Sequence, residues 1–106
     1  MTDAAYTSIY TQFFAELLDE LDDKTYMRVS KLIDLIEIEP NMGRGFFPEY
    51  EEDIPPVACR VIFVPGTTKC LYYVVDEKEE TIRFFHLGDT RADPRSRFAG
   101  VRKLPR

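Results

Sequence analysis

The order of apolar and polar residues along the chain predicts two helices near its start. Between residues 10 and 21 the apolar residues recur every three or four positions, as they do on one face of a helix. A second stripe with this period runs from about residue 24 to residue 39, where Pro40 stops it. The apolar residues of this second stripe are Tyr26, Val29, Leu32, Ile33 and Ile36. Two helices joined by a short polar connection should form an antiparallel hairpin.

Three apolar runs rich in β-branched and aromatic residues follow at 57–64, 69–75 and 81–87, and predict strands. Pro65-Gly66 between the first two suits a type II turn, and short connections of this kind join antiparallel neighbours. We therefore expect an α+β fold, with an N-terminal helical hairpin packed on a three- to four-stranded antiparallel sheet. Residues 5–10 fit either an extra edge strand or the first turn of the first helix.

The length of 106 residues suits a single domain. Its expected parts are a helical hairpin at 8–39, a loop at 40–56, antiparallel strands at 57–88 and a basic tail at 89–106. Residues 43–56 of this loop carry glycines, three prolines and the acidic run 49–53. The acidic run is either a solvated loop, a partner that holds the basic tail, or a mimic of nucleic-acid phosphates.

Composition narrows the class of protein. No stretch approaches 18 uninterrupted apolar residues and the N-terminus lacks the layout of a secretion signal, so we expect a cytoplasmic protein with no membrane segment. Cys59 and Cys70 lie in predicted strands, far from any histidine partner, and are most simply buried thiols. We expect no metal and no cofactor.

Charge is distributed unevenly along the chain. The net charge is −5, yet residues 81–106 carry seven Lys or Arg against two Asp, so the first 80 residues carry −10. An acidic chain is a poor general binder of nucleic acid. Arg91, Arg95 and Arg97 lie in the polar, turn-rich sequence DTRADPRSR. They either pair with acidic residues of their own domain or bind an anionic partner.

Several residues of the predicted sheet could carry chemistry. His86 is the only histidine, and it is either a general acid or base or a hydrogen-bonded residue at the end of the sheet. Strict alternation would place it on one face with Ile82 and Phe84, and Arg83, Phe85 and Leu87 on the other. Arg60 and Arg83 interrupt apolar strands, so they either reach solvent or bind a phosphate or carboxylate. Tyr73 either stacks on a base or belongs to the core or rim.

The layout resembles the RelE/ParE superfamily, toxins of bacterial type II toxin–antitoxin systems. The segment LIDLIEIEPNMGR is similar to the end of the family's second helix and its Pro-x-x-Gly-Arg exit. RVIFV and LYYVVD resemble its next two strands. TIRFFHLGDTRADP resembles its last strand and the basic turn that follows. The resemblance covers most of residues 10–98 and implies a cognate antitoxin as partner, with the oligomeric state left open.

Two activities are implied by the resemblance. RelE-like members cut messenger RNA on the ribosome, whereas ParE-like members bind and poison DNA gyrase. A nuclease would use His86 to move a proton and Arg60, Lys69 and Arg83 to stabilise charge on the phosphate. Lys69 stands where the family often has an arginine. In either case the expected partner-binding residues are Arg91, Arg95, Arg97 and Tyr73. The alternative is a non-catalytic interaction module, with acidic helices and a basic tail as its docking faces.

Overall fold

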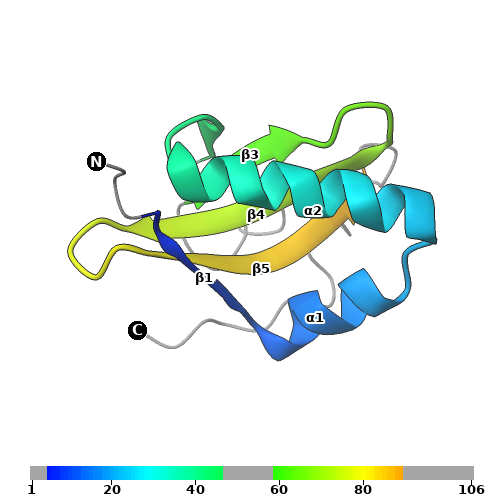
Figure 1. The fold of residues 1–106 in the computed structure, drawn as a ribbon, viewed down its shortest axis with the longest axis horizontal. Coiled ribbons are helices and arrows are strands. Elements are labelled where there is room, and N and C mark those ends of the chain that lie inside the picture. The colour runs from blue at the N-terminus through cyan, green and yellow to red at the C-terminus, as the bar shows by residue number, and fades with distance from the viewer. Residues whose placement is uncertain (1–4, 47–58, 90–106) are drawn as a thin grey trace.

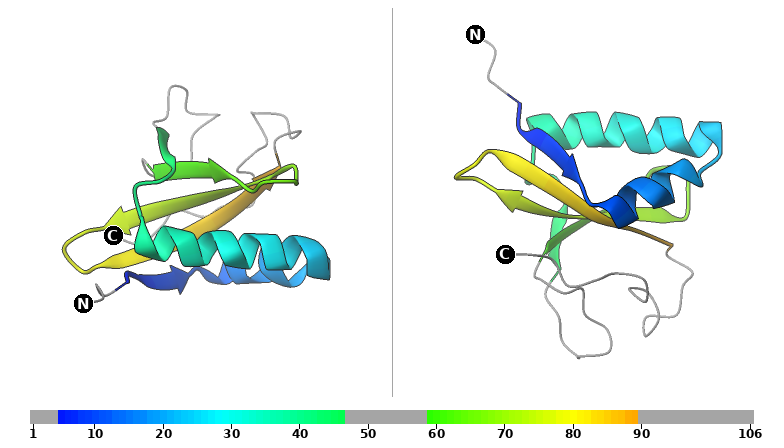
Figure 2. Two further views of the ribbon diagram at one scale, coloured as in Figure 1. Left: turned by 45° about the horizontal axis from the view of Figure 1, so that its top comes forward. Right: turned by 90° about the horizontal axis from the view of Figure 1, so that it is seen from below.

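The computed structural model describes residues 5–46 and 59–89, and the structural statements below concern these residues. They form one α+β domain (Figure 1). In chain order the elements are β1 (Thr7–Tyr10), α1 (Gln12–Asp19), α2 (Asp23–Ile38), β2 (Arg44–Phe46), β3 (Cys59–Phe63), β4 (Lys69–Asp76) and β5 (Thr81–Asp89). Figure 2 shows α2 lying across one face of the sheet. The predicted helical layer on a sheet is confirmed.

The strands form a sheet in the order β1-β5-β4-β3-β2. Strands β3, β4 and β5 are antiparallel neighbours, as their short connections predict. Strand β1 pairs with β5 in parallel, from Thr7 opposite Thr81 to Tyr10 opposite Phe84, so the sheet is mixed at this edge. This pairing settles the open question about residues 5–10, because residues 7–10 form a strand. The two partners are far apart in sequence, so no tight turn forces them to be antiparallel.

The predicted loop at 40–56 contains a short strand. Strand β2 pairs antiparallel with β3, with Arg44 opposite Val61 and Phe46 opposite Cys59. It forms because the edge of β3 offers backbone partners, whereas a stretch of three residues around Gly45 has no alternation that would reveal it. The rest of the predicted loop, residues 47–56, lies outside the described residues.

Local signals fix the start of α1 and the first hairpin. The Thr11 hydroxyl caps α1 by accepting a hydrogen bond from the Phe14 amide, at 3.1 Å. The predicted type II turn is confirmed by Gly66, whose φ of +77° lies in the left-handed region. The Thr67 amide closes this turn by donating to the Val64 carbonyl, at 3.2 Å. Neither of the two described helices is long and apolar enough to cross a membrane.

The main core lies between the helices and the sheet. The helices contribute Phe14, Leu18, Val29, Leu32, Ile33 and Ile36, and the sheet side contributes Val64, Leu71, Tyr73, Ile82, Phe84 and Leu87. A second buried cluster lies on the opposite face of the sheet and consists of Cys59, Val61, Cys70, Tyr72 and Phe85. Both cysteines are buried and free of disulfides, which confirms the prediction of buried thiols.

A bulge changes the alternation along β5. Tyr73 of β4 lies opposite Phe84, but the adjacent Tyr72 lies opposite His86, so Phe85 is an extra residue on β5. Leu87 consequently faces the helices in the main core. His86 lies beside Tyr72, with ring centroids 5.5 Å apart. The prediction that His86 shares a face with Ile82 and Phe84 is therefore wrong, as is the placement of Leu87 beside Arg83.

Candidate functional site

Arg60 binds the backbone that leaves α2. It lies on β3, opposite Tyr73 of β4. Its Nη2 donates to the carbonyl oxygen of Asn41, at 2.9 Å, and to that of Gly43. A guanidinium held by two carbonyls has fewer donors left for a phosphate. The structure thus gives Arg60 a part in fixing the connection between α2 and β2.

Tyr73 belongs to the core. Its side chain is 0% exposed. Its hydroxyl accepts a hydrogen bond from the Gly43 amide, at 3.1 Å, and donates to the Pro40 carbonyl, at 3.2 Å. Burial raises the pKa of this phenol, so it stays a neutral donor. The prediction that Tyr73 binds a partner is wrong for this structure, because its packing and hydrogen bonds leave no surface for contact.

Lys69 lies at the start of β4 and forms an ion pair. Its Nζ is 3.6 Å from a carboxylate oxygen of Asp89, its partner on β5. The Thr68 hydroxyl donates to the same carboxylate, at 3.1 Å. Lys69 shares a face with Leu71 and Tyr73 by strand alternation, so it lies on the helix-facing side of the sheet. Its charge is partly balanced by a neighbour on the adjacent strand.

His86 is surrounded by aromatic rings. It is only 6% exposed, and the ring of Phe13 from α1 stacks on it at a centroid distance of 5.9 Å. Tyr72 lies opposite His86 on the neighbouring strand β4. Arg83 lies opposite Val74, which packs against the second cluster, so both Arg83 and His86 belong to the side of the sheet away from α2.

The four residues predicted to act together in catalysis do not converge. Arg60 and Lys69 lie on the helix-facing side, near opposite ends of β4. The four-residue separation between Lys69 and Tyr73, the partner of Arg60, corresponds to about 13 Å along a strand. His86 and Arg83 lie on the other side. The described residues therefore hold no shared pocket in which His86, Arg60, Arg83 and Lys69 could contact one phosphate.

Three predicted partner-binding residues, Arg91, Arg95 and Arg97, lie outside the described residues. Their assignment remains a prediction from the sequence. Among the residues that the structure does describe, no group of three or more His, Cys, Asp or Glu side chains is placed to hold a metal ion.

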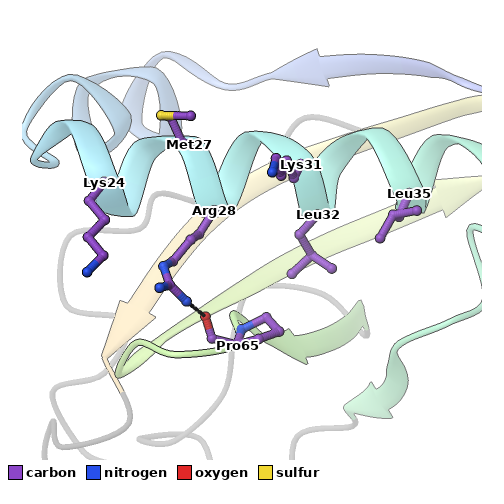
Figure 3. Close-up of a pocket in the computed structure, with 7 residues that line it drawn as sticks. All are labelled: Lys24, Met27, Arg28, Lys31, Leu32, Leu35 and Pro65. Carbon is purple, nitrogen blue, oxygen red and sulfur yellow. Dashed lines mark hydrogen bonds between the residues drawn. The ribbon is translucent and has the colours of Figure 1, made fainter.

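A surface groove lies between α2 and the turn that joins β3 to β4 (Figure 3). Its volume is about 430 Å³. It is lined by Lys24, Met27, Arg28, Lys31, Leu32, Leu35 and Pro65, and we call it the α2 groove. The Arg28 guanidinium reaches across and donates to the Pro65 carbonyl, at 3.1 Å. Glycine is favoured at position 66 because its φ of +77° is one that L side chains rarely adopt, and a Cβ there would also displace the Arg28 guanidinium.

The α2 groove combines apolar and cationic side chains. Met27 and Leu35, which both line the groove, are 59% and 52% exposed. Three cations, Lys24, Arg28 and Lys31, follow each other at helical spacing along the same edge. The groove is therefore a basic, apolar surface on an acidic protein.

The opposite edge of α2 is acidic and lies near β1. The Ser8 hydroxyl of β1 donates to the Glu37 carboxylate, at 2.5 Å. Burial raises the pKa of Tyr10, and the nearby carboxylates of Glu37 and Asp34 raise it further. The two long edges of α2 thus differ in the sign of their charge.

Sequence reasoning missed the α2 groove. The predicted apolar stripe of α2 covers the residues that pack on the sheet, and Met27 and Leu35 lie outside it. Met27 and Leu35 are eight positions apart and, with Lys24, Arg28 and Lys31, they fall on one second stripe. That stripe was visible in the sequence as apolar residues interleaved only with cations.

The fold is shared with solved structures of RelE proteins. The isolated E. coli RelE toxin is 12% identical with a TM-score of 0.66, and the match covers 84% of this chain and 88% of that chain. An archaeal RelE–RelB complex from Pyrococcus horikoshii OT3 gives 20% identity and a TM-score of 0.63, covering 83% and 99% of the two chains. The RelBE2 toxin–antitoxin complex from Mycobacterium tuberculosis is 19% identical with a TM-score of 0.60, and the match covers 80% of this chain and 98% of that chain.

No protein-family model and no curated protein sequence matches the chain. At such low identities the structural matches establish the fold alone. They confirm the resemblance to RelE toxins that the order of helices, exit motif and strands predicts.

Proposed function

We propose that this chain, which has the fold of RelE toxins, is the toxin of a type II toxin–antitoxin system. The observation that carries the proposal is the agreement with three RelE structures over 80–84% of this chain. Two of those three structures hold the RelE protein together with its RelB partner. By the same reasoning, a cognate antitoxin neutralises this chain in the cytoplasm.

The mode of action that best fits the site is inhibition by binding. A general acid or base must lie within about 3 Å of the proton that it moves. His86 is buried under Phe13, and two of its three predicted helpers, Arg60 and Lys69, lie on the other side of the sheet. We infer that these residues do not cleave RNA together, and that Arg91, Arg95 and Arg97 contact an anionic target. Inhibition by binding is the mode that the resemblance associates with DNA gyrase.

Induced expression in bacteria tests the proposal. The chain alone should arrest growth, and co-expression of the protein from the neighbouring reading frame should restore growth. His86→Gln should still arrest growth, whereas the triple variant Arg91→Glu, Arg95→Glu and Arg97→Glu should not. Circular dichroism on the purified variants separates loss of function from loss of fold.

Primer extension on cellular messages separates the two modes of action. New cuts that appear with the wild type and vanish with a folded His86→Gln variant would contradict inhibition by binding. Absence of growth arrest with the wild type would instead favour a non-catalytic interaction module, a role that the exposed α2 groove also suits.

A further inference from the structure

A second cavity lies where β4 continues past the start of its pairing with β3. The two strands pair from Arg60 opposite Tyr73 to Phe63 opposite Cys70, whereas β4 runs on to Asp76. The cavity has a volume of about 510 Å³, and we call it the β4 cavity. Its walls include, from one end to the other along β4, Arg60 and Tyr73, then Val74 and Val75, then Asp76 and Glu77.

The Arg60 end of the cavity holds a donor without an acceptor. Nη2 of Arg60 donates to the carbonyl oxygens of Asn41 and Gly43. Nε of the same side chain is buried and has no hydrogen-bond partner in the described part of the chain. No carboxylate of residues 5–46 or 59–89 lies within 4.0 Å of this guanidinium. Since buried donors are normally paired, this end favours a ligand that supplies an acceptor oxygen and a negative charge.

The opposite end of the cavity is acidic. Asp76 ends β4, Glu77 follows it, and both side chains are exposed. The Asp76 carboxylate accepts a hydrogen bond from the Glu79 amide, at 3.0 Å, which orients it. Within residues 5–46 and 59–89, neither Asp76 nor Glu77 forms an ion pair. This end therefore favours a cation, and its two carboxylates would repel a phosphate.

The distance between the two ends sets the length of the ligand. Tyr73 is the strand partner of Arg60, and the three-residue step from Tyr73 to Asp76 corresponds to about 10 Å along a strand. Val74 and Val75 lie between the ends and are half-buried, so the middle of the cavity suits an apolar stem. Lysine has this layout, because a four-carbon stem separates its ammonium group from its carboxylate end. Its net charge of +1 also balances one arginine and two carboxylates.

We propose that the β4 cavity binds a basic amino acid, with its carboxylate on Arg60 and its side-chain cation beside Asp76 and Glu77. A free amino acid and the C-terminal residue of a peptide share this chemistry. The bound ligand joins the segment after α2, which Arg60 holds, to the end of β4. The proposal goes beyond the proposed function and does not depend on it, because none of the proposed target-binding residues takes part.

Isothermal titration calorimetry of the folded chain with lysine tests the proposal. Norleucine keeps the carboxylate and the stem but lacks the side-chain cation, and pentylamine keeps the stem and the cation but lacks the carboxylate. Both analogues should bind at least tenfold more weakly than lysine. Lysine and either analogue binding equally well, or no binding of lysine at about 10 mM, would overturn the proposal. A peptide that ends in lysine identifies the source, since binding tighter than that of free lysine would support a protein C-terminus and weaker binding the free amino acid.

Variants at the acidic end test the position of the cation. Asp76→Asn combined with Glu77→Gln should weaken lysine binding at least tenfold. Both positions are exposed, and the new amide at position 76 can still accept from the Glu79 amide, so this variant should fold. The matched control is Glu79→Gln with Glu80→Gln, which removes two carboxylates of the β4–β5 turn that do not line the cavity. The control should bind lysine within about twofold of the wild type. An equal loss in both variants would reject the site, because net charge alone would then explain the binding.

The Nε–H group of Arg60 gives a direct readout of the carboxylate end. Its signal in ¹H–¹⁵N spectra of the labelled chain is assigned by triple-resonance experiments, so no variant of this structural residue is needed. Lysine should shift the signal, whereas pentylamine should leave it in place. An unchanged signal at saturating lysine would contradict the assignment of the carboxylate to Arg60. None of these measurements uses growth arrest, so their failure would leave the proposed function intact, and failure of the growth assay would leave the β4 cavity intact.

Discussion

The hydroxyl group of Tyr73 links the end of α2 to the sheet, so Tyr73→Phe should destabilise the fold. The change removes one oxygen and leaves the aromatic ring, with its packing against Phe84, in place. It deprives the Gly43 amide and the Pro40 carbonyl of the Tyr73 hydroxyl, to which they are hydrogen-bonded at 3.1 and 3.2 Å. The perturbation therefore tests hydrogen bonding with little change in core volume.

The expected loss follows from the surroundings of the two groups. Each intramolecular hydrogen bond contributes about 0.5–1.5 kcal/mol net, and a buried group left without a partner costs about 1–3 kcal/mol. Gly43 is buried, so its amide should carry most of the cost. Pro40 is only partly buried, so water can replace the hydroxyl at its carbonyl. We expect the free energy of unfolding to fall by about 2 kcal/mol.

Urea unfolding followed by far-UV circular dichroism measures this change. With a slope of about 1–3 kcal/mol per molar urea, the midpoint should fall by about 1 M. Tyr26→Phe is the matched control, because Tyr26 is 46% exposed and water solvates its hydroxyl. That variant should stay within about 0.5 kcal/mol of the wild type. Equal midpoints for the two variants would refute the structural role assigned to Tyr73.

Three further predictions concern the core and the sheet ends. Phe84→Ala should cost about 3–5 kcal/mol in the same urea assay, because Phe84 is 0% exposed and its ring lies 5.6 Å from that of Phe14. Burial raises the pKa of the Cys59 thiol from 9.0 to about 12. Cys59 should not react with a thiol reagent at neutral pH until urea unfolds the chain. Since the unfolded thiol loses its proton at lower pH than the folded one, the free energy of unfolding should fall as pH rises from 9 towards 12, and less steeply in Cys59→Ala. Lys69→Gln should cost less than about 1 kcal/mol by thermal unfolding, because its ion pair with Asp89 is partly exposed.

Periodicity in the sequence was sufficient to predict the helices and the three central strands. The repeat of apolar residues every three or four positions marked α2, and its buried residues Val29, Leu32, Ile33 and Ile36 are four of the five in the predicted stripe. The fifth, Tyr26, is 46% exposed. The short connections after β3 and β4 fixed the antiparallel order. These features depend on local spacing, which a single sequence records directly.

Features that depend on distant partners could not be predicted. Strand β1 is a strand because β5 lies beside it, and β2 because the edge of β3 does. The bulge at Phe85 shifts His86 and Leu87 relative to strict alternation, and no residue type requires a bulge at this place. A one-residue shift reverses the face of each side chain that follows, which is why His86 lies on the face opposite to Arg60 and Lys69.

Buried polar contacts could not be predicted from the sequence for the same reason. Arg60 looked available for a phosphate because its strand neighbours are apolar, yet it binds the carbonyls of Asn41 and Gly43. Tyr73 looked like a surface or stacking residue, yet its hydroxyl is hydrogen-bonded to Gly43 and Pro40 in the same segment. Both residues meet the segment after α2, some 17–33 positions away, and only the folded chain shows that this segment needs donors and acceptors.

Two separate stretches of this acidic chain each gather three positive charges, and we expect them to have separable roles. The first is the α2 groove, with Lys24, Arg28 and Lys31. The second is the sequence DTRADPRSR, which we propose contacts the target. Screening over roughly 8 Å at physiological salt lets distinct charged surfaces act independently on one small domain.

Independent surfaces predict a reciprocal pattern of losses. Lys24→Glu with Lys31→Glu should keep growth arrest and lose relief by the neighbouring protein. Charge reversal at Arg91, Arg95 and Arg97 should lose arrest and keep copurification with that protein. If one surface served both partners, each set of changes would weaken both readouts. If both folded variants lost arrest and copurification alike, the division of roles would be rejected. That result would indicate one surface that binds both partners.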